Sequence, residues 1–430
     1  MFSLLFPAFV HPFPVLHGDM GKLTIITTIV FFIFLPSSAL DNGLARTPPM
    51  GWMSWTVFRC QLNCTTYPDA CINEHLYQEM ADRLVSDGYR DVGYDHIHVD
   101  DCWMARIRDS NGRLVADPLR FPSGMKALAQ YMHDKGLYFG IYEDYGLETC
   151  AGFPGSYGHI QMDADSFAEW ECDYLKLDGC FMLPTDGHIG YPEMERALNA
   201  TGRPIMYSCE WPAYLYYDQN DVNYTEISKS CNLWRNFHDI AVSWQSLLDI
   251  INFFDKWQDK LIPAAGPGGW HDPDMLIIGI KPGLTVEQAK VQMSIWSIWS
   301  APLIMSNDLR SIDSEFKDIL QNRDVIAIDQ DPLGIMGRRV LNSQDNGVYV
   351  KPVTPTRGDA ASFALVVLNR HAEKTYTVQF ALYRIGLNNT LGYEVKDLWS
   401  KQDMGVMKPT DTLKVNVPPT GAAMFKATVI

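Results

Sequence analysis

Short apolar runs alternate with amphipathic stretches from residue 48 to about residue 310. One helix is predicted over Asn73–Ser86, where apolar residues recur every four positions, and another over Val286–Trp299, which opens with Thr285 and Gln288 in capping-box spacing. The apolar runs predict strands at Gly51–Met53, His96–Asp100, Tyr138–Tyr142, Tyr174–Asp178, Pro204–Ser208, Leu233–Trp234, Ile262–Ala265 and Leu303–Ser306. Strands alternating with helices over this length indicate a (β/α)₈ TIM barrel. The rival fold, an open doubly wound sheet, usually has a Gly-rich phosphate turn after its first strand, and this sequence has none.

The pattern changes after Asp331-Pro332. Short runs with in-and-out alternation follow, separated by Gly, Asn and Pro turns. These runs are Val348–Val353, Phe363–Leu368, Thr375–Phe380, Glu394–Leu398 and Leu413–Val417. They predict a C-terminal antiparallel β-sandwich at residues 333–430, after a catalytic barrel at residues 40–332.

The amino-terminal residues 1–39 have the features of a signal peptide with an upstream extension. Lys22 precedes the apolar run Leu23–Leu35, and Pro36–Ala39 supplies small residues for cleavage after Ala39. The apolar run is shorter than the roughly 20 residues that a transmembrane helix needs. We expect secretion without a membrane anchor; an uncleaved signal anchor is the alternative.

Composition narrows the choice of partner and compartment. The chain has 430 residues, 35 basic and 51 acidic, for a net charge of −16, which excludes nucleic acid and anionic membrane surfaces as expected partners. Nine cysteines in a secreted chain predict disulfides and one unpaired thiol, and the spacing lacks the paired C-x-x-C knuckles of a zinc site. Glycosylation sequons begin at Asn63, Asn199, Asn223 and Asn388.

Carboxylates recur where the predicted barrel strands end. Alternation places Tyr174, Lys176 and Asp178 on one face, and Asp100-Asp101 ends an earlier strand. Barrel enzymes carry their catalytic groups at these ends. A mouth rich in carboxylates and Trp suits glycoside cleavage, because one acid protonates the leaving oxygen and a second carboxylate attacks or activates water.

A divalent-metal hydrolase is the competing enzyme class. It would use Asp100, Asp101, His98, His271, Asp272 and Asp274. Metal barrels typically carry His-x-His on the first strand, whereas His96-Ile-His98 lies on the second. We therefore predict no metal and no cofactor, and expect both histidines in the barrel core or just behind the site.

Long motifs carry a family resemblance. They are Leu40–Trp52, Asp100–Trp103, Lys176–Cys180, Ser208–Tyr214, Trp234–Asp239 and Gly266–Met275. From about residue 40 to the C-terminus the chain resembles the α-galactosidase and α-N-acetylgalactosaminidase family, glycoside hydrolase family 27, and it looks most similar to the animal lysosomal members.

The resemblance implies a retaining mechanism with Asp178 as nucleophile and Asp239 as acid/base. Asp100, Asp101 and Lys176 match groups that hold the galactose 3-, 4- and 6-hydroxyls. The other implied pocket residues are Trp55, Tyr142, Glu210, Ala213, Tyr214, Arg235, Asp274 and Met275. The implied disulfides are Cys60–Cys102, Cys64–Cys71, Cys150–Cys180 and Cys209–Cys231, with Cys172 left as a buried thiol.

The two activities of the family differ at the sugar 2-position. Galactosidases carry Glu and Leu where N-acetylgalactosaminidases carry Ser and Ala; this chain has Glu210 with Ala213. We expect an α-galactosidase with secondary α-N-acetylgalactosaminidase activity. The alternatives are a predominant α-N-acetylgalactosaminidase and a non-catalytic sugar-binding protein on the same fold.

The resemblance also implies substrates, assembly and compartment. Expected substrates are α-galactosyl-terminated glycolipids, glycoproteins and oligosaccharides, and the expected assembly is a homodimer. Delivery to the lysosome through the secretory pathway, or secretion, is expected. His271 stands where close relatives often carry Asn, and we expect it just outside the pocket, tuning its neighbour Asp274.

Overall fold

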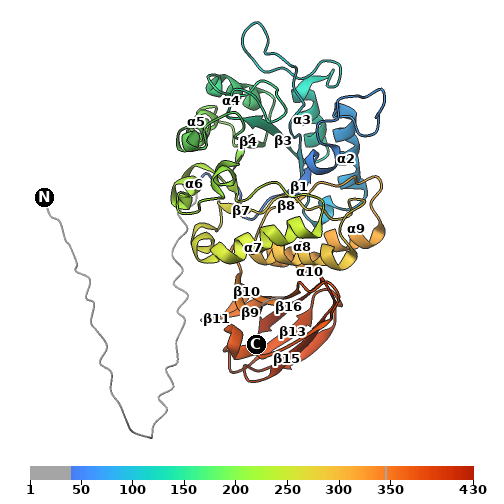
Figure 1. Cartoon of the computed structure of the whole chain (residues 1–430), viewed down its shortest axis with the longest axis vertical. Helices are drawn as coiled ribbons and strands as arrows, with labels where there is room; N and C mark the ends of the chain where they lie inside the picture. Colours follow the sequence, from blue (N-terminus) through green and yellow to red (C-terminus); the bar gives the residue numbers. More distant parts are fainter. Residues whose placement is uncertain (1–39, 344–345) are drawn as a thin grey trace, which may run out of the picture. The chain divides into compact units, whose positions relative to one another are not determined.

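Eight parallel strands form one sheet of the computed structural model, which describes residues 40–343 and 346–430 (Figure 1). The proposed signal peptide, residues 1–39, lies outside these ranges. The strands are β1 (Met50–Met53), β2 (His96–His98), β3 (Tyr138–Asp144), β4 (Tyr174–Asp178), β5 (Met206–Cys209), β6 (Leu233–Arg235), β7 (Trp270–Asp272) and β8 (Leu303–Met305). Their order is β7-β6-β5-β4-β3-β2-β1-β8. The barrel closes just past β7, where Leu276 forms a parallel bridge with Met305.

Helices follow the strands and lie around them (Figure 1). They are α1 (Trp55–Phe58), α2 (Glu74–Ser86), α3 (Gly124–Asp134), α4 (Ile160–Glu169), α5 (Gly187–Ala200), α6 (Tyr224–Ser230), α7 (Trp244–Leu261), α8 (Val286–Trp299), α9 (Ser314–Leu320) and α10 (Arg323–Asp329). The 3₁₀ turns of the barrel are η1 (Arg90–Val92), η2 (Pro184–Asp186), η3 (Trp211–Leu215) and η4 (Ile262–Ala264). The capping box predicted for α8 is present, with Thr285 accepting from the Gln288 amide. Among the described residues, no helix is both long and apolar enough to cross a membrane.

One predicted barrel strand is wrong. Ile262–Ala265 contains the 3₁₀ turn η4, and the seventh strand is β7, eight residues further on. Pro263 at the start of that turn has no N–H for a ladder hydrogen bond, and a short apolar run does not by itself distinguish strand from turn. The other seven strands lie where the apolar runs predict them, with ends shifted by up to two residues.

Aromatic and histidine side chains fill the barrel interior. The rings of His96 and His98 stack with their centroids 5.6 Å apart, and the ring of His98 lies 4.2 Å from that of Tyr174. A Cβ at Gly140 would come within 2.1 Å of His98 Nδ1, so β3 needs glycine there. Burial holds the pKa of His98 well below its usual value, which keeps the ring neutral. Both histidines therefore belong to the core.

The carboxy-terminal strands form an antiparallel sandwich. A six-stranded sheet has the order β14-β13-β16-β11-β10-β9, and β12 pairs with β15 in a second sheet. The strands are β9 (Arg338–Ser343), β10 (Asn346–Arg357), β11 (Ala360–Asn369), β12 (Tyr376–Ala381), β13 (Tyr393–Asp397), β14 (Asp403–Met407), β15 (Thr412–Val417) and β16 (Ala422–Val429), with η5 at Leu382–Ile385. A separate apolar core fills the sandwich. Sequence patterning missed β9, β14 and β16.

Helix α8 joins the barrel to the sandwich. It packs against β10, β11 and β16, which explains why it is apolar on nearly all sides. The buried Lys351 ammonium of β10 donates to the Ser297 and Ile328 carbonyls and to the Ser300 hydroxyl. Three acceptors satisfy its three protons, so this lysine ties the sandwich to the barrel.

The four disulfides of the structure are Cys60–Cys102, Cys64–Cys71, Cys150–Cys180 and Cys209–Cys231. These are the pairs that the family resemblance implies. Cys172 is a buried free cysteine, and burial raises the pKa of its thiol, so it packs as a small apolar residue. The four sequon asparagines, Asn63, Asn199, Asn223 and Asn388, are all exposed.

Candidate active site

The carboxyl ends of β2 and β4 bring three charged groups together. Lys176 Nζ on β4 donates to Asp100 Oδ2 at 2.9 Å, and both side chains are buried. Asp101 accepts from the Cys102 amide at 2.6 Å and from the Ala151 amide at 3.0 Å. Burial and the neighbouring Asp100 raise the pKa of Asp101 to about 6. These groups form a fixed, charged wall of the kind that binds sugar hydroxyls.

Arg235 at the end of β6 holds three carboxylates at once. Its Nη1 lies 3.1 Å from Glu210 Oε1, and its Nη2 lies 3.0 Å from Asp239 Oδ1 and 2.9 Å from Asp274 Oδ2. Lys176 adds a further contact to Glu210 at 3.6 Å. Glu210 is therefore clamped between two cations, while its burial raises its pKa well above the usual value.

Asp178, the last residue of β4, is held from both sides. Its Oδ1 accepts from the Tyr214 hydroxyl at 2.5 Å and its Oδ2 from the Tyr142 hydroxyl at 2.9 Å. The Gly179 amide adds a bond to Oδ1 at 2.8 Å. A Cβ at Gly179 would lie 2.9 Å from the Tyr214 ring, so glycine lets that ring approach. These donors fix the orientation of a partly exposed carboxylate.

Asp239 differs from its neighbours because it faces solvent. Its side chain is 71% exposed, whereas that of Arg235 is 5% exposed. Partial desolvation acts to raise the pKa of Asp239, but Arg235 and Lys176 outweigh it and leave that pKa below its usual value. Asp178 and Asp239 are thus two carboxylates in different surroundings, one held by tyrosines and one paired with arginine.

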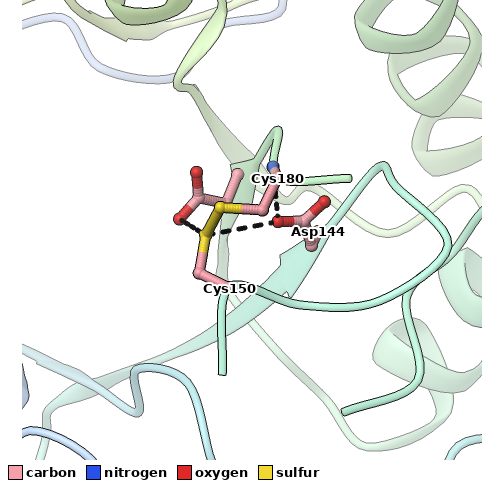
Figure 2. A group of neighbouring side chains, drawn as sticks. Asp144, Cys150 and Cys180 are labelled. Atoms are coloured by element: carbon pink, nitrogen blue, oxygen red, sulfur yellow. Dashed lines mark hydrogen bonds between the residues drawn. A yellow bond between two sulfur atoms is a disulfide. The ribbon is translucent and has the colours of Figure 1, made fainter. Parts of the chain in front are cut away.

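The disulfide Cys150–Cys180 lies against Asp144 (Figure 2), and Asp178 is also in contact with it. Cys150 Sγ is 3.4 Å from Asp178 Oδ2, and the Cys180 amide donates to Asp144 Oδ2 at 2.9 Å. These four residues bring potential metal-ligating atoms within 4.8 Å of one another. Because the two sulfurs are bonded to each other, neither is a thiolate, and the donor set does not fit a metal ion.

An apolar wall completes the pocket. Trp55 packs against a small cluster of Met53, Met275 and Ile304. Below it, a cavity with room for about one water is lined by Lys176, Glu210, Arg235, Asp272 and Asp274 among others. Ala213, in η3 between Glu210 and Tyr214, is partly exposed.

His271 does not act on Asp274. Its Nδ1 accepts from Trp234 Nε1 at 2.7 Å and its Nε2 donates to the Leu261 carbonyl at 2.8 Å, with Asn236 also beside the ring. Burial lowers the pKa of His271 to about 4. The expected tuning of Asp274 is therefore wrong: the imidazole is a neutral packing group on the outer face of β7, because alternation turns it away from its neighbour Asp272.

Sequence reasoning missed Asp144, and it named Asp272 only as a candidate ligand of the metal-hydrolase alternative. Asp144 shares its strand face with Tyr142, which is the signal that could have found it. Burial and the adjacent Asp178 raise the pKa of Asp144 to about 9. Burial likewise raises the pKa of Asp272 to about 6, although Arg235 opposes the shift. Both acids increase the density of carboxyl groups around the pocket.

Residues 47–331 match the family described as Alpha galactosidase A, and residues 344–427 match the Alpha galactosidase C-terminal beta sandwich domain. The chain belongs to glycoside hydrolase family 27. An α-N-acetylgalactosaminidase from Gallus gallus is 49% identical over 90% of this chain and 94% of its own length. The Alpha-galactosidase A of Homo sapiens is 46% identical over 96% of each chain.

Solved structures of other α-galactosidases are similar in fold to this family 27 hydrolase. The crystal structure of α-galactosidase I from Mortierella vinacea has a TM-score of 0.79 and 29% identity, covering 90% of this chain and 98% of that one. The α-galactosidase MEL1 from Saccharomyces cerevisiae has a TM-score of 0.78 and 27% identity, covering 92% and 100%. The protein is therefore a glycoside hydrolase built as a TIM barrel with a C-terminal β-sandwich.

Proposed function

We propose that this family 27 hydrolase is a retaining α-galactosidase, with Asp178 as nucleophile and Asp239 as acid/base. Asp178 attacks the anomeric carbon as the bond to the leaving oxygen breaks, and Asp239 gives that oxygen its proton. A water then attacks the glycosyl-enzyme, and Asp239 takes a proton from it. The double tyrosine clamp on Asp178 supports the first role, and the solvent-facing position of Asp239 supports the second.

The charge of the pocket suits this reaction. A carboxylate beside the anomeric carbon stabilises the positive charge that develops on the sugar ring in the transition state, and Asp178 is the residue proposed for that place. The raised pKa values of Asp101, Asp144 and Asp272 mean that several of these acids are protonated at acidic pH. Acidic solution therefore relieves their mutual repulsion and increases the protonated fraction of Asp239.

The preference for galactose over N-acetylgalactosamine rests on Glu210. Arg235 and Lys176 hold this carboxylate from two sides, so it has no freedom to swing away from a bulky 2-substituent. In this position it accepts a hydrogen bond from a 2-hydroxyl and crowds a 2-acetamide. The clamped Glu210 is the observation that carries the galactosidase assignment.

Ala213 favours a secondary α-N-acetylgalactosaminidase activity. Its small side chain leaves part of the space that Leu fills in the galactosidase pattern, so a 2-acetamide is disfavoured and not fully excluded. Relatives with either name match this chain at similar identity, so overall identity does not separate the two activities. The residues around the 2-position are the better guide.

The proposed substrates are glycolipids, glycoproteins and oligosaccharides that end in α-linked galactose. The sequons on exposed asparagines and the disulfides suit a protein of the secretory pathway, with the lysosome as the proposed destination. We also propose a homodimer as the working assembly.

The test is hydrolysis of p-nitrophenyl α-galactoside and p-nitrophenyl α-N-acetylgalactosaminide by the purified protein from about pH 4 to pH 7. We expect the larger kcat/KM for the galactoside. A larger kcat/KM for the acetamido sugar contradicts the galactosidase assignment. No turnover of either glycoside by folded protein favours the sugar-binding alternative.

A further inference from the structure

Aromatic rings that the galactose pocket does not use gather around His238, the residue before the proposed acid/base Asp239. Tyr216 and Tyr217 directly follow η3 and are 40% and 70% exposed. His238 is exposed too and immediately precedes Asp239. The ring centroids of Tyr216 and His238 lie 5.9 Å apart at an interplanar angle of 86°. Two loops that belong to different strands of the barrel thus meet at one aromatic surface.

This surface is anchored to the barrel. The ring of Tyr216 lies 5.2 Å from that of the half-buried Phe237, edge to face. Phe237 in turn lies 4.8 Å from the ring of Phe253, a buried residue of α7. Aromatic pairs of this geometry add stability beyond the area they bury, so Tyr216 is held in place before any ligand arrives.

The leaving oxygen of a glycoside must reach the exposed side of Asp239. Asp239 presents its free, exposed side to solvent because Arg235 occupies the opposite side. The glycosidic oxygen has to reach that exposed side to be protonated. Tyr214, which donates to Asp178, is only two residues before Tyr216. Tyr216 and His238 therefore lie close along the chain to both proposed catalytic groups, Tyr216 through Tyr214 and His238 as the residue before Asp239.

We propose that Tyr216, Tyr217 and His238 form a binding subsite for the first sugar ring of the leaving group. A hexose has one face of C–H bonds that packs on an aromatic ring, and hydroxyl edges that hydrogen-bond to a tyrosine hydroxyl or an imidazole nitrogen. This subsite rests on the proposed galactosidase activity and extends it. It makes α-galactosyl oligosaccharides, with a sugar next to the galactose, the preferred substrate class.

The surrounding charge favours a neutral, hydroxyl-rich ligand over a lipid surface. Asp218, Asn220 and Asp221 follow the two tyrosines, and Asn220 and Asp221 are exposed. Carboxylates at the rim repel anionic lipid headgroups and bring water to the edge of the aromatic surface. A sugar ring, which is apolar on one face and polar at its edge, fits both features.

The experiment compares a substrate that has a sugar leaving group with one that has none. The probes are a soluble α-galactosyl-terminated trisaccharide and α-galactosyl fluoride, and the readout is the ratio of their kcat/KM values. The variants are Tyr216→Ala and His238→Ala, with Tyr216→Phe to keep the ring. Tyr383→Ala is the matched control, because Tyr383 is an exposed tyrosine of the sandwich.

We expect Tyr216→Ala to lower the trisaccharide-to-fluoride ratio by about tenfold, mainly through a higher KM, and Tyr216→Phe and Tyr383→Ala to keep it within about twofold. An unchanged ratio in Tyr216→Ala overturns the subsite. Equal losses on both substrates mean a structural role only and also overturn it. So does a loss confined to galactolipid in micelles, which would indicate lipid contact. If the native protein cleaves neither galactosyl substrate, the galactosidase assignment itself fails, which is a distinct result.

Discussion

Glu210→Ser tests how the pocket distinguishes a 2-hydroxyl from a 2-acetamide. The substitution removes the carboxylate that lies 3.1 Å from Arg235 and 3.6 Å from Lys176, and it opens the space that this carboxylate fills. Both cations keep other partners: Lys176 retains Asp100, and Arg235 retains Asp239 and Asp274. The substituted site therefore loses one acceptor and gains room without leaving a bare cation.

The magnitudes follow from these contacts. Loss of a hydrogen bond from the 2-hydroxyl to a charged acceptor costs about 1.5–3 kcal/mol, which lowers kcat/KM for the galactoside by roughly 10- to 150-fold. Breaking a buried ion pair by removing one partner costs about 3–5 kcal/mol of stability. Because Arg235 and Lys176 keep their other carboxylates, we expect a loss at or below the lower end of that range, about 2–3 kcal/mol.

The assay measures kcat/KM for p-nitrophenyl α-galactoside and for the corresponding α-N-acetylgalactosaminide. For Glu210→Ser we expect their ratio to move toward the acetamido sugar by about 100-fold or more. Glu210→Gln is the matched control, because it keeps the size and removes the charge. It should lose galactoside activity without gaining activity on the acetamido sugar.

One result would refute the reasoning. The thermal transition and circular dichroism first establish that Glu210→Ser is folded. If its ratio of the two kcat/KM values then equals that of the native protein, Glu210 does not determine the preference at the sugar 2-position. A gain of acetamido activity in Glu210→Gln equal to that of the serine variant would show that charge, and not space, decides the preference.

Three further changes test other parts of the site. Ala213→Leu should lower kcat/KM for the acetamido glycoside by about tenfold or more and change kcat/KM for the galactoside by less than about threefold, because Leu fills space that only the acetamide needs. An equal loss on both substrates would contradict this and would mean a general disturbance of η3. For an α-galactosyl disaccharide, whose sugar leaving group must be protonated, kcat/KM should fall as pH rises from about 4 to 7. Arg235 holds the pKa of Asp239 low, so the protonated fraction of Asp239 falls over that interval, and a kcat/KM that rises with pH would contradict the account. His271→Asn should lose less stability than the native protein when the pH is lowered from about 7.5 to about 5. His271 has a pKa near 6.5 in the unfolded chain but about 4 in the folded protein, so the unfolded chain binds more protons and the native protein loses about 2 kcal/mol over that interval. Urea denaturation at the two pH values measures this, and an equal pH response of the two proteins would refute the neutral buried imidazole.

Most strands of the barrel can be predicted from the sequence because they are short buried runs that end in charged residues. The run Tyr174–Asp178 predicts both its strand and the face that carries Lys176 and Asp178, since alternation alone fixes that face. The seventh strand was misplaced because Ile262–Ala265 is as apolar as a strand, and only the geometry at Pro263 shows it to be a turn.

Some strands of the sandwich could not be predicted from the sequence, for a different reason. Strand β14 is exposed over most of its length and contains Gly405, so it has no buried face to mark it. Strand β16 lies between β11 and β13, and its Ala and Thr residues give only a weak alternation. Strand identity in these segments depends on the neighbours with which they pair, which is tertiary information.

The individual pocket residues could be predicted from motifs, but their connections could not. Arg235, Glu210 and Asp274 come from three separate strand ends, and one guanidinium joins them only after the barrel has closed. The same holds for the aromatic surface, where Tyr216 and His238 come from separate loops. Such contacts between distant segments decide specificity, and no local pattern in the sequence reports them.

The measurement that tests the central mechanism most directly is trapping of the glycosyl-enzyme. The native protein would be incubated with a slowly hydrolysed fluorinated α-galactosyl fluoride, digested and mapped by mass spectrometry, with Asp178→Asn as the control. We predict one fluorogalactosyl adduct, on the peptide that carries Asp178, and none on the Asp178→Asn protein. An adduct on Asp239 or on any other carboxylate would contradict the assignment of the nucleophile.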